Sequence, residues 1–413
     1  MCEQKDIMPK TPKIGSYTLS LTPPVLLFSL ILLLSVTVPV QARPWPFFDR
    51  YARTFLQDDG RVIDRDAGGR TTSEGEAYAL FFSLVEGNST RFGTILKWTE
   101  ENLAKGDLFH HLPAWLWGRR PDGTWGVLDA HSASDADCWL AYDFLEAGRL
   151  WHRRDLRLKG MVLLKRIALG EVATRSRERT VLLPGPFGFV MTDGSLRLNP
   201  SYTPSALLRR FSTVDPDGPW RRIRKTGDRL FPLIAPRGFV PDWFLLHPDG
   251  SVSWDPVKGP VGSFDAIRVY LWKGLEDSGE ECGKQDAGAE ETGGIARYLA
   301  SHRVPPAVVN TYLGTGAGEG SPGFSAALLP YLLARGDVRE YRIQRSRVAA
   351  FFKNGLLGSP PRYYDQNLAL FGLGFVEGRF SFSRSGNLVP GKGAPNPCAA
   401  RISRTGTSGR RGL

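Results

Sequence analysis

The chain has 413 residues, of which 42% are hydrophobic, so it is long enough and apolar enough to build a sizeable core. Its formal net charge of +11 is typical of nucleic-acid-binding proteins, but no nucleic-acid-binding motif is present, and we expect no nucleic-acid partner. The six histidines lack metal-ligand spacing, and no nucleophile elbow or catalytic Cys/His signature occurs. The sequence therefore predicts no metal site and no organic cofactor.

The N-terminus, residues 1–42, has the organisation of a signal peptide. A segment with three lysines precedes an almost wholly apolar run from Val25 to Val40, and Ala42 offers a small residue for cleavage before Arg43. The competing interpretation is an uncleaved anchor, but the apolar run is shorter than the roughly 20 residues that span a bilayer. We predict a periplasmic or secreted protein with no stable membrane anchor after cleavage.

Helical spacing of apolar residues dominates the rest of the chain, interrupted by short loops rich in Gly, Pro and Asp. No compositional break divides this part, so we predict one domain over 43–390 and an all-α fold. Short strands are expected at 180–184, 188–190 and 195–198, around a turn at Asp193-Gly194. The expected helices cover 45–57, 75–88, 91–105, 136–152, 155–171, 203–213, 217–232, 265–275, 290–302, 323–334, 338–352 and 363–373.

The later loops and the C-terminus carry weaker signals. Residues 278–294 are acidic and rich in glycine, which is typical of a solvated surface insertion. Residues 391–413 are basic and rich in Gly, Ser and Thr, and we predict a disordered tail there. Cys138 is expected to be a buried small hydrophobic residue, whereas Cys282 and Cys398 could pair in an oxidising compartment.

Three short acidic segments each begin a stretch of helical spacing: Ser73-Glu74-Gly75-Glu76, Ser134-Asp135-Ala136-Asp137 and Ser263-Phe264-Asp265-Ala266. A serine at the start of each is a plausible N-cap, and Ser73 with Glu76 fits a capping box. For each acid taken alone, helix capping is the better explanation.

If the three helices run parallel, however, their N-termini lie on one rim and the carboxylates of Glu74, Asp135 and Asp265 can converge on one cleft. The chain is also rich in aromatic residues, with 11 Trp, 12 Tyr and 23 Phe. Paired carboxylates in an aromatic cleft indicate hydrolysis of a sugar bond.

The sequences of these segments are specific, and they resemble glycoside hydrolase family 8. The family signature is similar to the run from Ala133 to Asp137 with the following Leu140-Ala141-Tyr142. The general-acid segment is similar to the run from Thr72 to Tyr78, and the general-base segment to the run from Asp265 to Trp272. The resemblance extends from about Trp45 to Phe382, and within the family it is closest to the periplasmic endoglucanases associated with bacterial cellulose synthase. Further matching segments are 112–118, 199–202, 323–330 and 363–364.

This resemblance implies an (α/α)6 barrel of six inner and six outer helices, with a short β-hairpin and long loops lining one rim. It implies an inverting endo-β-1,4-glucanase that hydrolyses internal bonds of cellulose during bacterial cellulose biosynthesis or export. The expected partners are a β-1,4-glucan chain and, transiently, the cellulose synthase or export complex. Two alternatives stay open: a catalytically weak glucan-binding accessory protein of the synthase, or a hydrolase of chitosan, mixed-linkage glucan or xylan.

The resemblance also suggests roles for individual residues. Glu74 is the expected general acid and Asp265 the general base that activates water, while Asp135 grips the sugar at the cleavage point. Asp137 is interpreted as structural. Arg268, which could instead form an ordinary i, i+3 ion pair with Asp265, is expected to line the site.

Candidate sugar-binding aromatic residues complete the predicted site. Flat apolar faces of glucose stack on aromatic rings, so we expect some of these rings to form platforms. Relatives often have Tyr directly before the general base, whereas this chain has Phe264, so a hydroxyl group is missing there. The candidate platforms are Trp115, Trp117, Tyr202, Trp243, Trp254, Tyr363 and Tyr364.

Overall fold

The computed structural model describes residues 44–405, apart from 177, 277–292, 392 and 394–395. The predicted signal peptide and most of the acidic insertion at 278–294 lie outside the described residues. Within the described part, no helix combines the length and the apolar character needed to cross a membrane.

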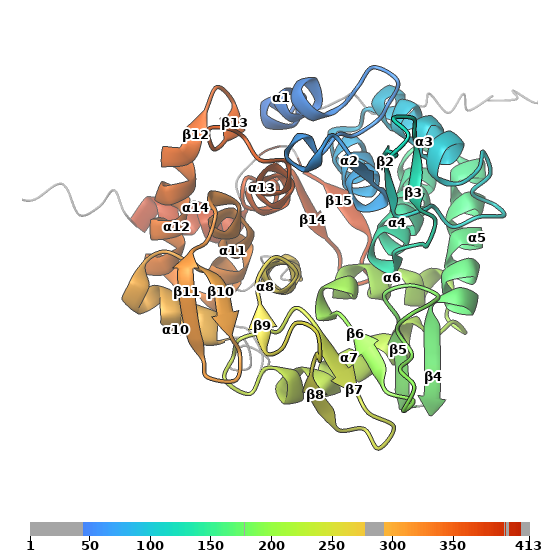
Figure 1. Cartoon of the computed structure of the whole chain (residues 1–413). Helices are drawn as coiled ribbons and strands as arrows, with labels where there is room; N and C mark the ends of the chain where they lie inside the picture. Colours follow the sequence, from blue (N-terminus) through green and yellow to red (C-terminus); the bar gives the residue numbers. More distant parts are fainter. Residues whose placement is uncertain (1–43, 177, 277–292, 392, 394–395, 406–413) are drawn as a thin grey trace, which may run out of the picture. The chain divides into compact units, whose positions relative to one another are not determined.

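An inner layer of helices forms the centre of the fold (Figure 1). Most of these helices are buried on nearly every side, because their sequences are apolar all round, as in Ala77-Tyr78-Ala79-Leu80-Phe81. Neighbours in this layer pack directly on one another, for example α2 on α4 and α11 on both α8 and α13. The inner helices are α2 (Ser73–Glu86), α4 (Ser134–Leu150), α6 (Ser205–Val214), α8 (Ala266–Leu275), α11 (Pro322–Arg335) and α13 (Tyr363–Val376).

An outer layer of helices surrounds the inner one, which gives the predicted (α/α)6 barrel (Figure 1). These helices bury one apolar stripe and expose a polar face, as α5 does through Leu156, Leu163 and Ile167. All of the helices predicted from the sequence are found, and most of their ends agree to within two or three residues. The outer helices are α1 (Pro46–Phe55), α3 (Ser89–Leu103), α5 (Arg154–Gly170), α7 (Trp220–Ile234), α10 (Gly293–His302) and α12 (Val338–Phe351).

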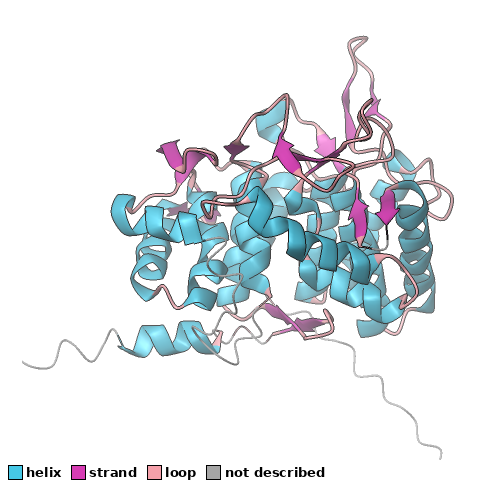
Figure 2. Cartoon of the chain, turned by 90° about the horizontal axis from the view of Figure 1, so that it is seen from below, coloured by secondary structure: helices cyan, strands magenta, loops and turns pink. Residues whose placement is uncertain are grey.

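Small antiparallel sheets lie at the ends of the barrel, and most of the strands are at one end of the helices (Figure 2). They are more numerous than the sequence predicts. Two of the expected strands pair elsewhere: β5 (Arg179–Leu182) with β4 (Val172–Ser176), and β6 (Leu196–Leu198) with β7 (Phe244–Leu246). The expected turn is present, since Gly194 has φ +82° and the Met191 N–H donates to the Ser195 carbonyl at 2.8 Å.

The remaining strands are short and lie mostly in the loops that join the helices. One sheet, β1–β2–β3, places Thr71 opposite Trp117 and so connects the start of α2 to the 116–129 hairpin. These strands are β1 (Thr71–Thr72), β2 (Leu116–Arg119), β3 (Trp125–Asp129), β8 (Val252–Trp254), β9 (Val261–Gly262), β10 (Pro306–Asn310), β11 (Thr315–Glu319), β12 (Phe352–Lys353), β13 (Leu356–Leu357), β14 (Phe380–Phe382) and β15 (Leu388–Pro390).

The barrel is filled by aromatic side chains. The Phe371 ring lies 5.0 Å from Tyr78, 5.1 Å from Trp139 and 5.2 Å from Trp272, measured between ring centroids. These four buried residues come from α13, α2, α4 and α8, so one aromatic cluster joins four inner helices. Much of the aromatic surplus of the sequence is therefore core, and this core supports the helix ends that carry the acidic segments.

The C-terminus differs from the sequence prediction. A helix, α14 (Pro397–Thr405), lies inside the 391–413 segment that we predicted to be disordered, because Cys398 and Ala399 are buried against the core and Ile402 packs on it. Cys138 is buried and free, as expected. Cys398 is disulfide-bonded, but its expected partner Cys282 lies outside the described residues, so this pairing stays a prediction.

Candidate active site

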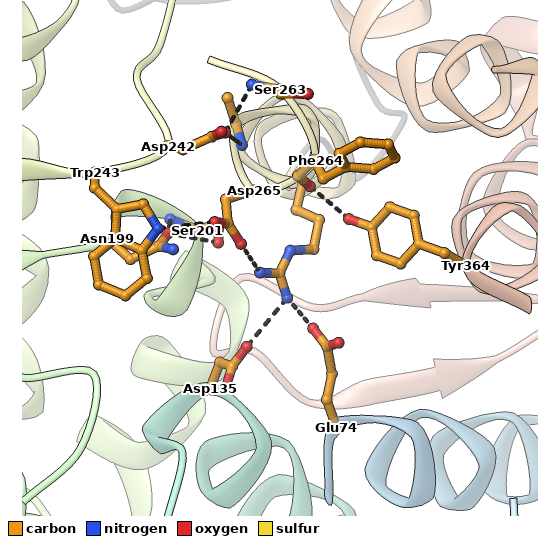
Figure 3. A network of polar contacts seen from close by, with 12 residues as sticks. Glu74, Asp135, Asn199, Ser201, Asp242, Trp243, Ser263, Phe264, Asp265 and Tyr364 are labelled. Atoms are coloured by element: carbon orange, nitrogen blue, oxygen red, sulfur yellow. Dashed lines mark hydrogen bonds and ion pairs between the residues drawn. The ribbon is translucent and has the colours of Figure 1, made fainter. Parts of the chain in front are cut away.

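The three acidic segments meet at one side chain, Arg268 of α8 (Figure 3). One guanidinium nitrogen, Nη1, donates to Glu74 and also to Oδ2 of Asp135 at 3.1 Å. The other, Nη2, donates to Oδ1 of Asp265 at 2.6 Å. Carboxylates separated by up to 191 residues of sequence thus surround one buried cation, and Arg268 makes much more than a local i, i+3 ion pair.

Glu74 stands in the first turn of α2, with a quarter of its side chain exposed. The N-cap is Thr72, whose hydroxyl oxygen accepts from the Gly75 N–H at 3.2 Å, so the predicted capping box of Ser73 and Glu76 is wrong. The Glu76 carboxylate instead accepts the Val62 N–H at 2.8 Å. Burial raises the pKa of Glu76 well above the usual range, although this hydrogen bond opposes the shift. Its burial leaves Glu74 as the acid of this segment that faces the cluster.

Asp135 is the most deeply buried carboxylate of the cluster. It begins α4, where its Oδ1 accepts the Ala136 N–H at 2.8 Å. Burial first, and the nearby Glu74 second, raise the pKa of Asp135 to about 7, although Arg268 opposes the shift. Three carboxylates around one guanidinium carry an excess of negative charge, and the cluster therefore retains a proton close to neutral pH.

Asp265 is the N-cap residue of α8, but its side chain makes no capping hydrogen bond. Its two oxygens face other groups: Oδ1 accepts from Arg268, and Oδ2 accepts the Trp243 indole N–H at 3.1 Å. Asp242, which lies outside α8, caps the start of this helix instead (Figure 3): its Oδ1 accepts the Ala266 N–H at 2.8 Å. The carboxylate of Asp265 is consequently left available to the cluster.

Sequence reasoning missed Tyr78 and Asp242. The Tyr78 hydroxyl donates to Glu74 at 2.9 Å, and the i, i+4 spacing of these residues on α2 is a signal that could have identified it. Asp242 lies outside all three acidic segments and gave no signal beyond its position next to the aromatic candidate Trp243.

The predicted sugar platforms have different surroundings. Tyr202 lies near the cluster, with the Arg268 guanidinium carbon 5.8 Å from its ring centroid. Trp243 is flanked by Phe189, stacked at 6.0 Å, and by Arg197, whose guanidinium carbon is 4.4 Å from the ring centroid. Trp254 contacts Tyr312, at 6.4 Å between centroids, on the neighbouring loops.

Trp115 and Trp117 lie at the β2 edge, next to the start of α2. The Trp115 carbonyl accepts the Ser73 N–H at 3.1 Å, and Trp117 stacks on Trp125 at 5.3 Å. Trp125 is 46% exposed, and the buried Arg61 lies over both rings. This stacked pair is a partly open aromatic surface, and only Trp117 of the two was predicted as a sugar platform.

Tyr363 and Tyr364 point to different places. Tyr363 is buried, and its ring lies 5.9 Å from Phe55 and 6.5 Å from Tyr51, so it belongs to the core rather than to an open face. The Tyr364 hydroxyl donates to the Phe264 carbonyl at 2.5 Å (Figure 3). Phe264 is 57% exposed, and it has no hydroxyl to offer the site.

Among the described residues, no group of three or more His, Cys, Asp or Glu side chains is arranged to hold a metal ion. The carboxylates, guanidinium and phenols of the cluster can donate protons, abstract protons and form hydrogen bonds to hydroxyl groups.

Comparison with known proteins places this geometry in a family. The model of the glycosyl hydrolases family 8 matches residues 25–378. A protein of Xanthomonas axonopodis pv. citri (strain 306) is 43% identical over 368 residues, which cover 89% of this chain and 94% of that protein. An Escherichia coli (strain K12) protein is 40% identical over 87% of this chain and 95% of its own length. A crystal structure from Vibrio fischeri ES114 matches with a TM-score of 0.76 and 37% identity, covering 84% of this chain and 99% of that one.

Proposed function

Because the chain belongs to glycosyl hydrolase family 8, we propose that it is an inverting endo-β-1,4-glucanase that hydrolyses internal bonds of cellulose during bacterial cellulose biosynthesis or export. The Xanthomonas and Escherichia relatives are both named endoglucanase, and the Vibrio structure is described as an endo-1,4-D-glucanase. The chain is accordingly a glycoside hydrolase of the endoglucanase type.

The observation that carries the proposal is the convergence of Glu74, Asp135 and Asp265 on Arg268. We assign Glu74 as the general acid that protonates the leaving glycosidic oxygen. Asp265 is the general base that takes a proton from the attacking water, and Asp135 binds the sugar between them. The fold brings all three side chains to one place, and it leaves those of Glu74 and Asp265 partly exposed.

The charge of the cluster suits a general acid. A glucan hydroxyl that entered the cluster would compete with the carboxylates for the Arg268 guanidinium. The proton retained close to neutral pH, which the pKa of Asp135 reflects, is the kind of proton that protonation of the leaving oxygen needs. Tyr78 would hold the Glu74 carboxyl in place through its hydrogen bond during the transfer.

An inverting mechanism needs room for a water molecule between the sugar and the base, with carboxyls about 6.5–9.5 Å apart rather than about 5–5.5 Å. The guanidinium of Arg268 stands between Glu74 and Asp265, and this separation of the two acids supports inversion. Proton NMR of early hydrolysis products tests it. We expect the α-anomer to form first, whereas a β-anomer would mean a covalent intermediate and a different role for Asp265.

The substrate is tested by measuring reducing-end release from carboxymethyl cellulose, chitosan, mixed-linkage glucan and xylan with the mature protein. We expect the highest kcat/KM on carboxymethyl cellulose. A higher value on one of the other polymers would identify that polymer as the substrate instead. Cellulose binding with no hydrolysis of any polymer would favour the glucan-binding accessory role.

The proposed cellular setting is export followed by cleavage of a signal peptide covering residues 1–42, ahead of a catalytic domain over 43–390. In that setting the protein is periplasmic or secreted and contacts the synthase or export complex only transiently. Mass analysis should find the mature N-terminus near Arg43 outside the cytoplasm. An intact Met1 in the cytoplasm would contradict the proposal.

A further inference from the structure

We propose that Asp242 is a positioning residue for the general base: it fixes the first turn of α8 and thereby the orientation of Asp265. This inference rests on the proposed role of Asp265 and adds a residue that lies outside the three acidic segments. It concerns how the base is held, since Asp242 makes no contact with Arg268 and none with the Asp265 side chain among the hydrogen bonds of the described residues.

The hydrogen bonds of Asp242 span Asp265 from both sides. Its Oδ1 accepts the Ser263 N–H at 2.7 Å and the Ala266 N–H at 2.8 Å (Figure 3). Asp265 lies between these two amides in sequence, so one carboxylate oxygen of Asp242 holds the backbone on both sides of the base. Two hydrogen bonds to one charged acceptor are stronger than neutral ones and restrict the local backbone.

Asp242 is itself held firmly. It is buried, and its own N–H donates to the Val261 carbonyl at 2.7 Å, next to the short strand β9. The following residue, Trp243, donates its indole N–H to Oδ2 of Asp265. Adjacent residues of one loop therefore hold the base through its backbone and through its side chain.

Asp242 also adds negative charge beside the base. Four charged or titratable groups face it: Asp265 and Arg268, Tyr270 of α8 and Tyr364 of α13. Burial first, and Asp265 second, raise the pKa of Asp242 to about 6. Replacement by Asn removes this charge but keeps an oxygen that can accept both amides, whereas replacement by Ala removes the acceptor as well.

The two replacements therefore separate positioning from charge. We expect Asp242→Ala to lower kcat on carboxymethyl cellulose about 10²-fold, with KM changed less than about threefold, since a misplaced catalytic group costs about this much. Asp242→Asn should keep kcat at its own optimum within about fivefold. It should therefore recover most of the kcat that Asp242→Ala loses.

Asp215→Asn is the matched control. Asp215 is likewise a buried carboxylate, and it accepts an indole N–H, from Trp220 at 3.0 Å, but it lies at the end of α6 and touches none of the cluster residues. We expect it to change thermal stability without lowering kcat.

The outcomes are distinct. Asp242→Ala with wild-type kcat, or Asp242→Asn with a kcat loss as large as that of Asp242→Ala, overturns the proposal. If Asp242→Ala does not fold, Asp242→Ser takes its place, because its shorter side chain cannot reach both amides and should lower kcat in the same way. Full activity of Asp265→Asn would instead overturn the assignment of the base, independently of Asp242.

Discussion

Two clusters of carboxylates lie close together at the start of α4, and they differ in how their negative charge is neutralised. Asp135 joins Glu74 and Asp265 around Arg268, at a place that a ligand can reach in part. Two residues along the same helix, Asp137 faces Glu171 in full burial, and neither forms an ion pair within the part of the chain that the structure describes.

In the second cluster, burial without an ion pair among the described residues favours the neutral form of the acids. Burial raises the pKa of Glu171 to about 7 and that of Asp137 well above its usual range, with Glu171 as the next cause for Asp137. The Ser132 hydroxyl donates to Glu171 at 2.6 Å. The comparison teaches that an Asp-x-Asp motif on a helix can contain one acid for chemistry and one for the core, and that the nearby cation distinguishes them.

Removing a carboxylate from the Arg268 cluster should have the largest effect. Glu74→Gln and Asp265→Asn should each keep the fold and lower kcat about 10²–10⁴-fold, the usual contribution of a general acid or base. Hydrolysis of carboxymethyl cellulose measures this loss, with the exposed Glu101→Gln as control. Full activity in either variant would remove that residue from its assigned role.

Changing the cation should have the next largest effect. Arg268→Lys keeps the charge, but a single ammonium group cannot reach three carboxylates in the fork geometry of a guanidinium. We expect kcat to fall about 10–100-fold and the pH optimum to move. Arg224→Lys, at an exposed pair with Asp228, is the control and should leave both quantities unchanged. An unaltered optimum in Arg268→Lys would show that the cluster does not depend on its shared cation.

The buried pair should influence stability rather than catalysis. Glu171 binds its proton more tightly in the folded protein, so the free energy of unfolding falls as pH rises from about 4.5 to about 7. Glu171→Gln removes this dependence. We therefore expect the Tm difference between this variant and wild type to be a few degrees more favourable to the variant at pH 8 than at pH 5, with kcat within about threefold of wild type. Calorimetry at both pH values checks this, and an equal Tm change at both would contradict it.

Replacing a buried carboxyl outside both clusters, Asp143, should have the smallest effect on stability and activity. Burial raises the pKa of Asp143 well above its usual range, and neither of its oxygens has a hydrogen-bond partner in the described structure. Asp143 is therefore expected to stay protonated, and Asp143→Asn should change Tm by less than about 2 °C between pH 5 and 7. A large loss of stability would reveal a contact that depends on the carboxylate.

The sequence predicted the helices and the three convergent acids well, because apolar spacing and long motifs are local signals. It could not predict which acids serve as caps. Thr72 rather than Ser73 caps α2, and the buried Glu76 carboxylate accepts the Val62 N–H from the segment that precedes β1. Asp242 escaped notice for the same reason: its importance lies in amides more than 20 residues away.

The helix α14 and most of the short strands were missed because their stability depends on tertiary contacts. A segment rich in Gly, Ser and basic residues is read as a tail unless the burial of Cys398 and Ala399 is known. Two-residue strands such as β1 show no periodicity at all, and they form where an inner helix begins beside a neighbouring loop.

The contacts between α1 and the end of the chain constrain the order of events in the life of the protein. Phe47 lies 4.9 Å from Phe352, and the Tyr363 amide donates to Asp66 at 3.1 Å, so the first and last parts of the described chain complete one another. A growing chain has Glu74 long before it has α13. The ring of helices cannot close until nearly the whole polypeptide has been synthesised, so the barrel that holds Glu74, Asp135 and Asp265 around Arg268 forms late.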